Sequence, residues 1–272
     1  MSPNMNKKTN RVILTVREKD ASNSELSALV SHVMGRKMAV LKRDTNVNGR
    51  VSVHFHPAPK FELLYGEKAV CGDGGFCGDN REAVRLDENR LMLILSDGMG
   101  MGERAYRTSM NAILMIESFY RAGFDHETVL ATVGRLLSLR ESEDFNALDI
   151  SVIDIKKGTV DFIKQGGRES FLVSNGIVEV VECGSLPLGI VTESMPIIEQ
   201  RKLQTGDVLM LASDGVIDSL GVDAIKEILL ETKTVNPQVI ADIIIDNAAL
   251  HASEKGRIDD MSCLVARVVS AA

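Results

Sequence analysis

The sequence predicts an α+β fold in which two antiparallel sheets are flanked by helices, and three observations support this fold class. After residue 140 the chain runs through short apolar segments separated by Gly, Asn or Pro, a density of turns typical of antiparallel sheet. Helical periodicity occurs in two pairs of segments, one before this run and one after it. A regular alternation of strand and helix is missing, which argues against a doubly wound parallel sheet.

The N-terminal part of the chain predicts a strand, a helix and further strands. Residues 12–16 (VILTV) indicate a strand, and the next segment indicates a helix that starts at a possible capping box of Ser22 and Glu25 and ends at Gly35. The predicted apolar face of this helix consists of Leu26, Leu29, Val30, Val33 and Met34. Strand candidates follow at residues 38–41, 51–55 and 60–70, with residues 44–50 as a loop or boundary.

The remainder of the chain supplies the two helix pairs. A glycine-rich link over residues 71–80 precedes an apolar strand, and helices are then predicted over residues 104–123 and 125–139. Asp125 is placed to cap the second of these. The second pair is predicted around residues 222–231 and 237–251, with Asn236 and Pro237 at the start of the last helix. The chain ends on the strand candidate 261–269.

Composition excludes some functions. The 272 residues include no Trp and only 4% aromatics, so stacking platforms for nucleic acid are not expected. Residues 1–50 contain ten Lys/Arg against four Asp/Glu, whereas the rest contains 21 against 34. This basic N-terminal segment could bind nucleic acid or an acidic membrane surface, but a solvent-exposed charged face is the simpler interpretation. No apolar run reaches the roughly 20 residues needed to cross a bilayer, and the first residues lack the apolar core of a signal peptide.

The four cysteines suggest a reducing compartment. They are Cys71, Cys77, Cys183 and Cys263, and the spacing of the nearest two fits no common zinc motif. We therefore expect a cytoplasmic protein with reduced, mostly buried thiols.

One short stretch carries the first sign of chemistry. In "LMLILSDGMGMGERA" (91–105), an apolar strand ends in Ser-Asp-Gly, and glycines alternate with methionines before a helix. A dinucleotide fingerprint needs its third glycine at position 103, where the chain has Glu, and Asp97 would repel a bare pyrophosphate. A metal ion between acid and phosphate removes that objection.

Acids recur at comparable places. "LMLASDGV" (209–216) repeats the strand ending in Ser-Asp-Gly, with Asp214 lying 117 residues after Asp97. Asp79 lies 18 residues before Asp97, far enough for a hairpin to bring the two side by side, and Asp259 and Asp260 precede the final strand. Each acid taken singly suits an ordinary turn. Together they predict a site for hard divalent cations, which prefer oxygen ligands.

The motifs that carry a family resemblance are "CGDN", "LSDGMGMGERA", "LLSLRE", "LDISVIDI", "GSLPLGI", "SDGV" and "DDMS". In this order and spacing they resemble the SpoIIE phosphatases of spore-forming bacteria, a branch of the PPM class of metal-dependent Ser/Thr protein phosphatases. The resemblance covers about residues 59–269, and residues 22–43 resemble the segment that precedes the phosphatase domain in longer SpoIIE proteins. Those proteins have a membrane-spanning region that this chain lacks, so we expect an excised domain or a soluble relative.

The resemblance implies a fold and a metal site. The fold would be a four-layer α-β-β-α sandwich, two central antiparallel sheets flanked by helix pairs. Two Mn²⁺ or Mg²⁺ ions would bind at one end, shared by Asp79 and Asp97, with the backbone of Gly98 as a further ligand. Asp214 and Asp259 would complete the second ion, with Asp260 as the alternative to Asp259. A water held between the two metals would attack the phosphorus.

The resemblance also implies organisation and partners. Residues 1–58 would be an N-terminal regulatory or dimerisation segment, and residues 59–272 the PPM-type phosphatase domain. The substrate would be a phosphorylated anti-sigma-factor antagonist (an anti-anti-sigma-type protein) of sporulation, with a homodimer possible and no nucleic acid or membrane segment involved. The alternatives are a catalytically weak binding module of the same fold and a phosphatase of small phosphoesters.

Overall fold

A computed structural model of the chain describes residues 3–6, 11–23, 25–46, 49–72, 75–98, 102–138, 145–182, 184–188, 196–254 and 259–271. Backbone contacts divide the chain into two compact units, Met1–Lys60 and Phe61–Ser270. Within the described ranges, no helix combines the length and the apolar character that crossing a membrane requires.

The first unit is a four-stranded antiparallel sheet with one α-helix. Its strands lie in the order β1-β2-β4-β3 and comprise β1 (Pro3–Asn6), β2 (Arg11–Arg17), β3 (Met38–Asn46) and β4 (Arg50–Pro57). A short 3-10 turn, η1 (Glu18–Asp20), leads to α1 (Glu25–Met34). Alternate residues of β2 are buried, and they share a core with Leu26 and Val30 of α1.

Helix α1 differs from the prediction in two details. The side chain of Asn23, rather than Ser22, accepts the Glu25 N–H at 2.9 Å and caps the helix. Leu29 and Val33 were predicted to face the core, yet they are 50% and 69% exposed. The narrower stripe of Leu26, Val30 and the partly buried Met34 packs on the sheet, because a single small sheet covers one side of a helix.

The second unit contains two five-stranded sheets in which all pairs are antiparallel. One has the order β12-β9-β8-β7-β6 and the other β11-β10-β13-β14-β5. The strands are β5 (Phe61–Val70), β6 (Asp79–Arg85), β7 (Arg90–Gly98), β8 (Asn146–Asp154), β9 (Thr159–Gln165), β10 (Ser170–Ser174), β11 (Ile177–Val181), β12 (Ile197–Lys202), β13 (Val208–Ala212) and β14 (Met261–Ser270).

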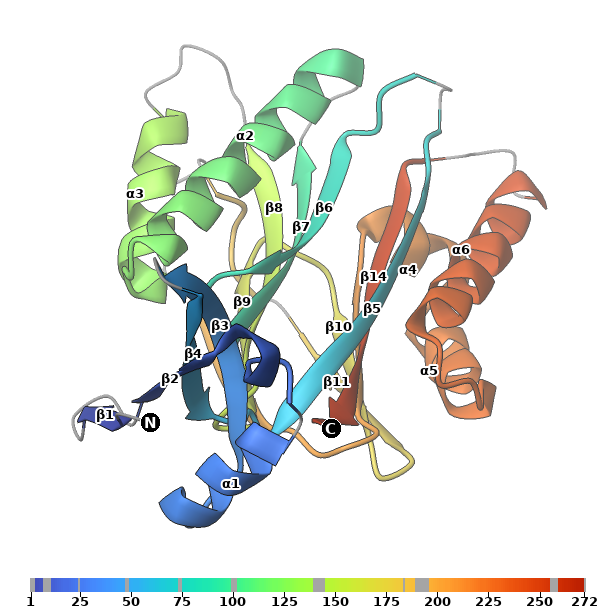
Figure 1. Cartoon of the computed structure of the whole chain (residues 1–272). Coiled ribbons are helices and arrows are strands. Elements are labelled where there is room, and N and C mark those ends of the chain that lie inside the picture. The colour runs from blue at the N-terminus through green and yellow to red at the C-terminus, as the bar shows by residue number, and fades with distance from the viewer. Residues whose placement is uncertain are drawn as a thin grey trace. The chain divides into compact units, whose positions relative to one another are not determined.

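Helices cover the outer face of each sheet of the second unit (Figure 1). They are α2 (Gly102–Arg121) and α3 (His126–Ser138) on one side, and α4 (Asp214–Leu220), α5 (Val222–Glu231) and α6 (Pro237–Glu254) on the other. Separate apolar cores fill the two helix–sheet layers and the space between the sheets. The predicted four-layer α-β-β-α sandwich of the α+β class is therefore confirmed.

Strand β7 shows why the layers fix the position of its C-terminal end. Met92 and Ile94 belong to the core shared with α2 and α3, whereas Leu91, Leu93 and Leu95 belong to the core between the sheets. A slip of one residue would exchange these two sets, so burial on both faces fixes the register. Asp97, two residues beyond Leu95, is thereby held at one place on the sheet edge.

Several local predictions are confirmed, but one strand, β6, and one helix, α4, were missed. Asp125 caps α3 by accepting the Thr128 N–H at 2.8 Å, and Asn236 does the same for Gln238 at 3.0 Å. The sequence did not predict α4, because seven residues after a strand carry little periodicity.

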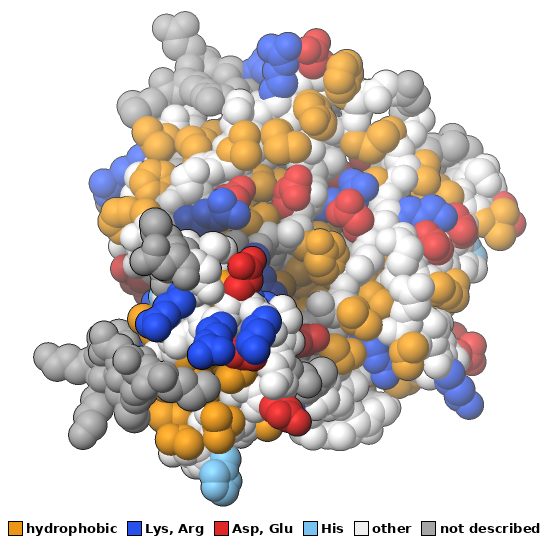
Figure 2. Space-filling view, in the orientation of Figure 1, with side chains coloured by type: hydrophobic (Ala, Val, Ile, Leu, Met, Phe, Trp, Pro, Cys, Tyr) orange, Lys and Arg blue, Asp and Glu red, His pale blue; other side chains and the backbone are white. Residues whose placement is uncertain are grey.

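Charged side chains of both signs occur together on the face drawn in Figure 2, with apolar side chains between them. A basic stripe of the kind that follows a nucleic-acid backbone is not evident on the described part of this face.

Candidate metal centre

Two of the predicted acids face each other across neighbouring strands. Asp79 is the first residue of β6 and pairs directly with Asp97 near the end of β7, so the predicted side-by-side placement is confirmed. Asp79 is only 3% exposed. Burial and strand pairing together hold two carboxylates at one sheet edge, where they oppose each other with like charge.

Gly98 connects this pair to helix α2. Its N–H donates to the Gly78 carbonyl at 3.3 Å, and the Ser109 hydroxyl of α2 donates to the same carbonyl at 2.6 Å. A Cβ on Gly98 would collide with the backbone carbonyl of Ala105. The glycine is therefore needed for the close approach of α2, as well as for the turn that the sequence indicated.

Asp214 reaches the site from the other sheet. It is the first residue of α4, immediately after Ser213, whose N–H donates to the Ser262 carbonyl at 2.9 Å. The following Gly215 lies against the backbone carbonyl of Asp260, with no room for a Cβ. The second Ser-Asp-Gly motif thus lies beside the start of β14, from which the last pair of acids comes.

Asp259 and Asp260 have different surroundings. The carboxylate of Asp260 accepts the Gly72 N–H at 2.8 Å and the Gly78 N–H at 2.6 Å, and so it joins both ends of the loop before β6. Asp259 is exposed, and its carboxylate accepts the Asp260 N–H at 3.0 Å. Because Asp260 is engaged by backbone donors, Asp259 stays our preferred candidate ligand.

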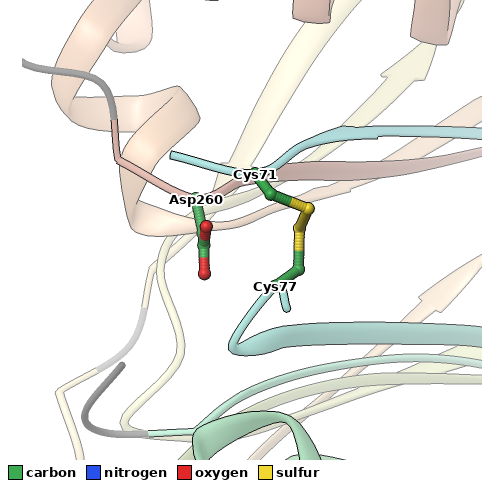
Figure 3. Close-up of side chains that lie close together, drawn as sticks. All are labelled: Cys71, Cys77 and Asp260. Carbon is green, nitrogen blue, oxygen red and sulfur yellow. A yellow bond between two sulfur atoms is a disulfide. The ribbon is translucent and has the colours of Figure 1, made fainter. Parts of the chain in front are cut away.

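The cysteine prediction is wrong for two of the four residues. Cys71 and Cys77 form a disulfide beside Asp260, and both are partly exposed (Figure 3). The Cα atoms of Cys71 and Cys77 are 5.0 Å apart, a proximity that zinc-motif spacing could not reveal. Cys263 is free and buried as predicted, and Cys183 lies outside the described residues.

Within the described ranges, only Cys71, Cys77 and Asp260 bring three possible ligand atoms within 4.8 Å of one another. The four predicted acids are not gathered that tightly. Two ions about 4 Å apart spread their ligands over more space than one coordination shell.

The pKa values show that the acids nevertheless share one electrostatic environment. Burial, followed by the charges of Asp79, Asp214, Asp259 and Asp260, raises the pKa of Asp97 to about 8. Burial, followed by the charges of Asp214 and Asp260, raises the pKa of Asp79 to about 7. Burial and the charge of Asp259 also raise the pKa of Asp214. These carboxylates cannot all ionise at neutral pH without a compensating positive charge.

The donor set fits hard divalent cations. Oδ2 of Asp79 is buried and has no hydrogen-bond partner in the described part of the chain. A buried carboxylate oxygen in this state is costly unless a cation or a proton binds it. Asp79, Asp97, Asp214 and Asp259, with the backbone of Gly98, are all oxygen donors of the kind that Mg²⁺ and Mn²⁺ prefer.

Sequence reasoning missed one cation next to these acids. Arg168, in the turn between β9 and β10, donates from its NH2 group to Asp218 at 2.8 Å, one helical turn after Asp214. Its charge also acts to lower the pKa of Asp214. No sequence motif indicated this arginine.

Comparison with solved structures defines the class of the domain. The PP2C phosphatase domain of the cell fate determinant SpoIIE from Bacillus subtilis, solved with a fragment of its regulatory domain, superposes with a TM-score of 0.75 at 26% identity, over 97% of this chain and 80% of that one. The second unit thus has the fold of a PP2C-type serine/threonine phosphatase domain.

The sequence comparisons identify the family. The family described as Stage II sporulation protein E (SpoIIE) matches residues 87–269, and the chain belongs to this family. Its relatives include Stage II sporulation protein E of Bacillus subtilis, 28% identical over 91% of this chain, and that of Priestia megaterium, 30% identical over 89%. The chain spans 31% and 43% of the length of these two relatives.

Proposed function

We propose that this chain is a metal-dependent protein serine/threonine phosphatase. The observation that carries the proposal is the pairing of Asp79 with Asp97, whose pKa values are raised by burial and by the acids of the opposite sheet. A protein gains no stability from clustered buried carboxylates, so their presence suggests a function that needs a bound cation. Membership of the SpoIIE family supports the same conclusion.

Each residue has an assigned role. Asp79 and Asp97 would be shared by two Mn²⁺ or Mg²⁺ ions, the backbone of Gly98 would bind one of them, and Asp214 and Asp259 would hold the second. When bound, such ions lower the pKa of a water and neutralise phosphoryl oxygens. The protein keeps these carboxylates on fixed strand and helix ends, so the site needs no Cys, Ser or His nucleophile.

The substrate class follows from the family. We propose a phosphorylated anti-anti-sigma-type protein, dephosphorylated on Ser or Thr during sporulation, by analogy with the relatives named Stage II sporulation protein E. Two alternatives are a catalytically weak binding module and a phosphatase of small phosphoesters.

The N-terminal segment of residues 1–58, which lies within the first unit (Met1–Lys60), would regulate the domain. Because the Ser109 hydroxyl of α2 and the Gly98 N–H donate to the same Gly78 carbonyl, movement of α2 would disturb the metal-binding backbone. We propose that docking of α2 and α3 is coupled to dimerisation through the N-terminal segment. A chain without residues 1–58 that kept full, concentration-independent activity would contradict this coupling.

The central test is phosphate release from a phosphoserine protein, with Mn²⁺ and with chelator. We expect metal-dependent turnover by the wild type and a loss of more than about 100-fold in Asp97→Asn, since even outer-shell partners of a ligand contribute 10- to 100-fold. Asp223→Asn, which changes a carboxylate that is 94% exposed, is the matched control. Activity without metal, or a fully active Asp97→Asn variant, would reject the proposal. Preference for nucleotides over the phosphoprotein would favour the small-phosphoester alternative.

A further inference from the structure

The turn between β9 and β10 is built with little freedom. Gly166 has φ +72°, and a Cβ there would lie 2.5 Å from Cα of Pro187. A Cβ on Gly167 would lie 2.7 Å from the carbonyl oxygen of Leu148. The turn is therefore wedged between β8 and the segment that contains Pro187, and only glycines fit at these two positions. The next residue is Arg168.

A buried lysine fixes the backbone of that arginine. Lys164 is fully buried, and its ammonium group donates to Asp149 at 2.9 Å, to Ser170 at 2.8 Å and to the carbonyl of Arg168 at 2.5 Å. Ser170 in turn donates to Asp149. An ammonium has three donors, and all three find acceptors here. A fully buried ion pair adds little to stability compared with apolar residues of similar size, so its arrangement calls for another explanation.

The side chain of Arg168 extends from this fixed backbone toward the acids. Its NH2 group donates to Asp218, and Asp218 follows Asp214 by four residues, on the same face of α4. Its Nε lies 3.4 Å from Glu169 but has no hydrogen-bond partner in the described part of the chain. Nε is buried, but 40% of the side chain is exposed, so the terminal nitrogens of the guanidinium are accessible to a ligand beside the candidate metal centre.

We propose that Arg168 binds the phosphoryl group of the substrate, and that Lys164 is the residue that positions it. This inference rests on the proposed function, because the ligand is a phosphoester. The predicted ligand side chains of the candidate metal centre are all carboxylates, which repel a phosphate dianion unless cations lie beside them. A guanidinium presents a planar pair of donors that matches two phosphate oxygens, which a lysine cannot reproduce. If Arg168 served only to pair with Asp218, its backbone would not need to be held by the buried Lys164.

Orthophosphate is the probe for the arginine. We expect Arg168→Ala to weaken phosphate binding, measured by calorimetry in saturating Mn²⁺, by about 10- to 100-fold, the usual value of a hydrogen bond to a charged group. The phosphate affinity of Arg168→Lys should lie between that of the wild type and that of Arg168→Ala. Arg201→Ala is the matched control, because Arg201 is 32% exposed and also pairs with two carboxylates, Glu179 and Glu199, on β11 and β12. Wild-type affinity in Arg168→Ala would overturn the inference.

The same assays separate the two proposals. If the wild type turns over a phosphoprotein and Arg168→Ala does so equally well with equal phosphate affinity, the inference fails and the proposed function stands. If the wild type shows no turnover but binds phosphate through Arg168, the proposed function fails and the arginine site stands. If the wild type neither binds phosphate nor turns over substrate, both fail.

Testing the role of Lys164 requires a variant that leaves no unpaired charge in the core. Lys164→Met combined with Asp149→Leu removes both buried charges, and such replacements usually preserve folding. We expect this double variant to bind Mn²⁺ normally but to lose about 10-fold in phosphate affinity, because a misplaced group contributes less. Adding Arg168→Ala to it should cause a smaller loss than the same substitution causes in the wild type. A full additional loss would show that Lys164 does not act through Arg168.

Discussion

The two halves of the candidate site are built in different ways. Asp79 and Asp97 lie on paired strands of one sheet, with apolar cores on both faces of β7. Asp214 begins the helix that follows β13, and Asp259 precedes β14 of the other sheet. The cation Arg168 pairs with Asp218, one helical turn after Asp214. The first half is thus fixed by strand register and strongly like-charged. The second half is fixed by local turns, and the positive charge of Arg168 partly offsets the negative charge of its acids.

The largest expected effect of this difference is on metal binding and activity. Neutralising one acid of the first half should cause a greater loss than neutralising Asp259. Asp79→Asn and Asp97→Asn should abolish measurable Mn²⁺ binding and activity, because each acid would serve both ions. Asp259→Asn should keep one ion and lose about 10- to 100-fold in metal affinity. Calorimetric titration with Mn²⁺ measures both the number of bound ions and their affinity in each variant. The two halves would prove equivalent if all three variants lost binding to the same degree.

Each half also contains a glycine that close backbone packing requires. Gly98→Ala and Gly215→Ala would drive a methyl group into the carbonyls of Ala105 and Asp260. We expect each to lower the free energy of unfolding by about 2–3 kcal/mol. Urea unfolding provides the measurement, and Gly75→Ala, which has open space around it, should stay within about 0.5 kcal/mol of wild type. Gly98→Ala should also weaken Mn²⁺ binding, since it displaces α2 from the candidate ligand backbone.

The disulfide loop connects the two halves, because Asp260 from the second accepts N–H groups of Gly72 and Gly78, just before Asp79. Closing this short loop should stabilise the fold by about 2 kcal/mol. We therefore expect a dithiol reductant to lower the melting temperature by about 4–8 °C and to weaken Mn²⁺ binding.

A Cys71→Ser/Cys77→Ser variant is the control for this experiment. It should match the reduced wild type and should not respond to the reductant. An unchanged melting temperature on reduction of the wild type would show that the hydrogen bonds of Asp260 alone secure the loop.

The sequence allowed one half of the site to be predicted better than the other. Strand-ending Ser-Asp-Gly motifs and an 18-residue hairpin were sufficient to pair Asp79 with Asp97, because strand register follows from alternating burial. The start of α4, the disulfide and Arg168 were not predicted. Helix α4 is too short to show periodicity, and the spacing of Cys71 and Cys77 matches no motif that indicates a disulfide. Arg168 depends on a contact between segments distant in sequence, because Asp218 lies 50 residues away. Local patterns carry no information about such contacts.

The smallest expected effect is a pH dependence of the metal-free protein, which originates in the first half. The pKa values of Asp79 and Asp97 are about 7 and 8 in the folded chain, against an ordinary value near 4 for an unfolded Asp. Between those limits the folded state binds more protons than the unfolded state, so stability falls as pH rises from about 4 to about 8. In chelator, the melting temperature should be a few degrees higher at pH 6 than at pH 8.5. Saturating Mn²⁺ should remove or reverse this difference, because the cations replace the protons.

An Asp79→Asn/Asp97→Asn variant is the control and should show little change of melting temperature with pH in chelator. An unchanged pH dependence in that variant would assign the effect to other titratable groups.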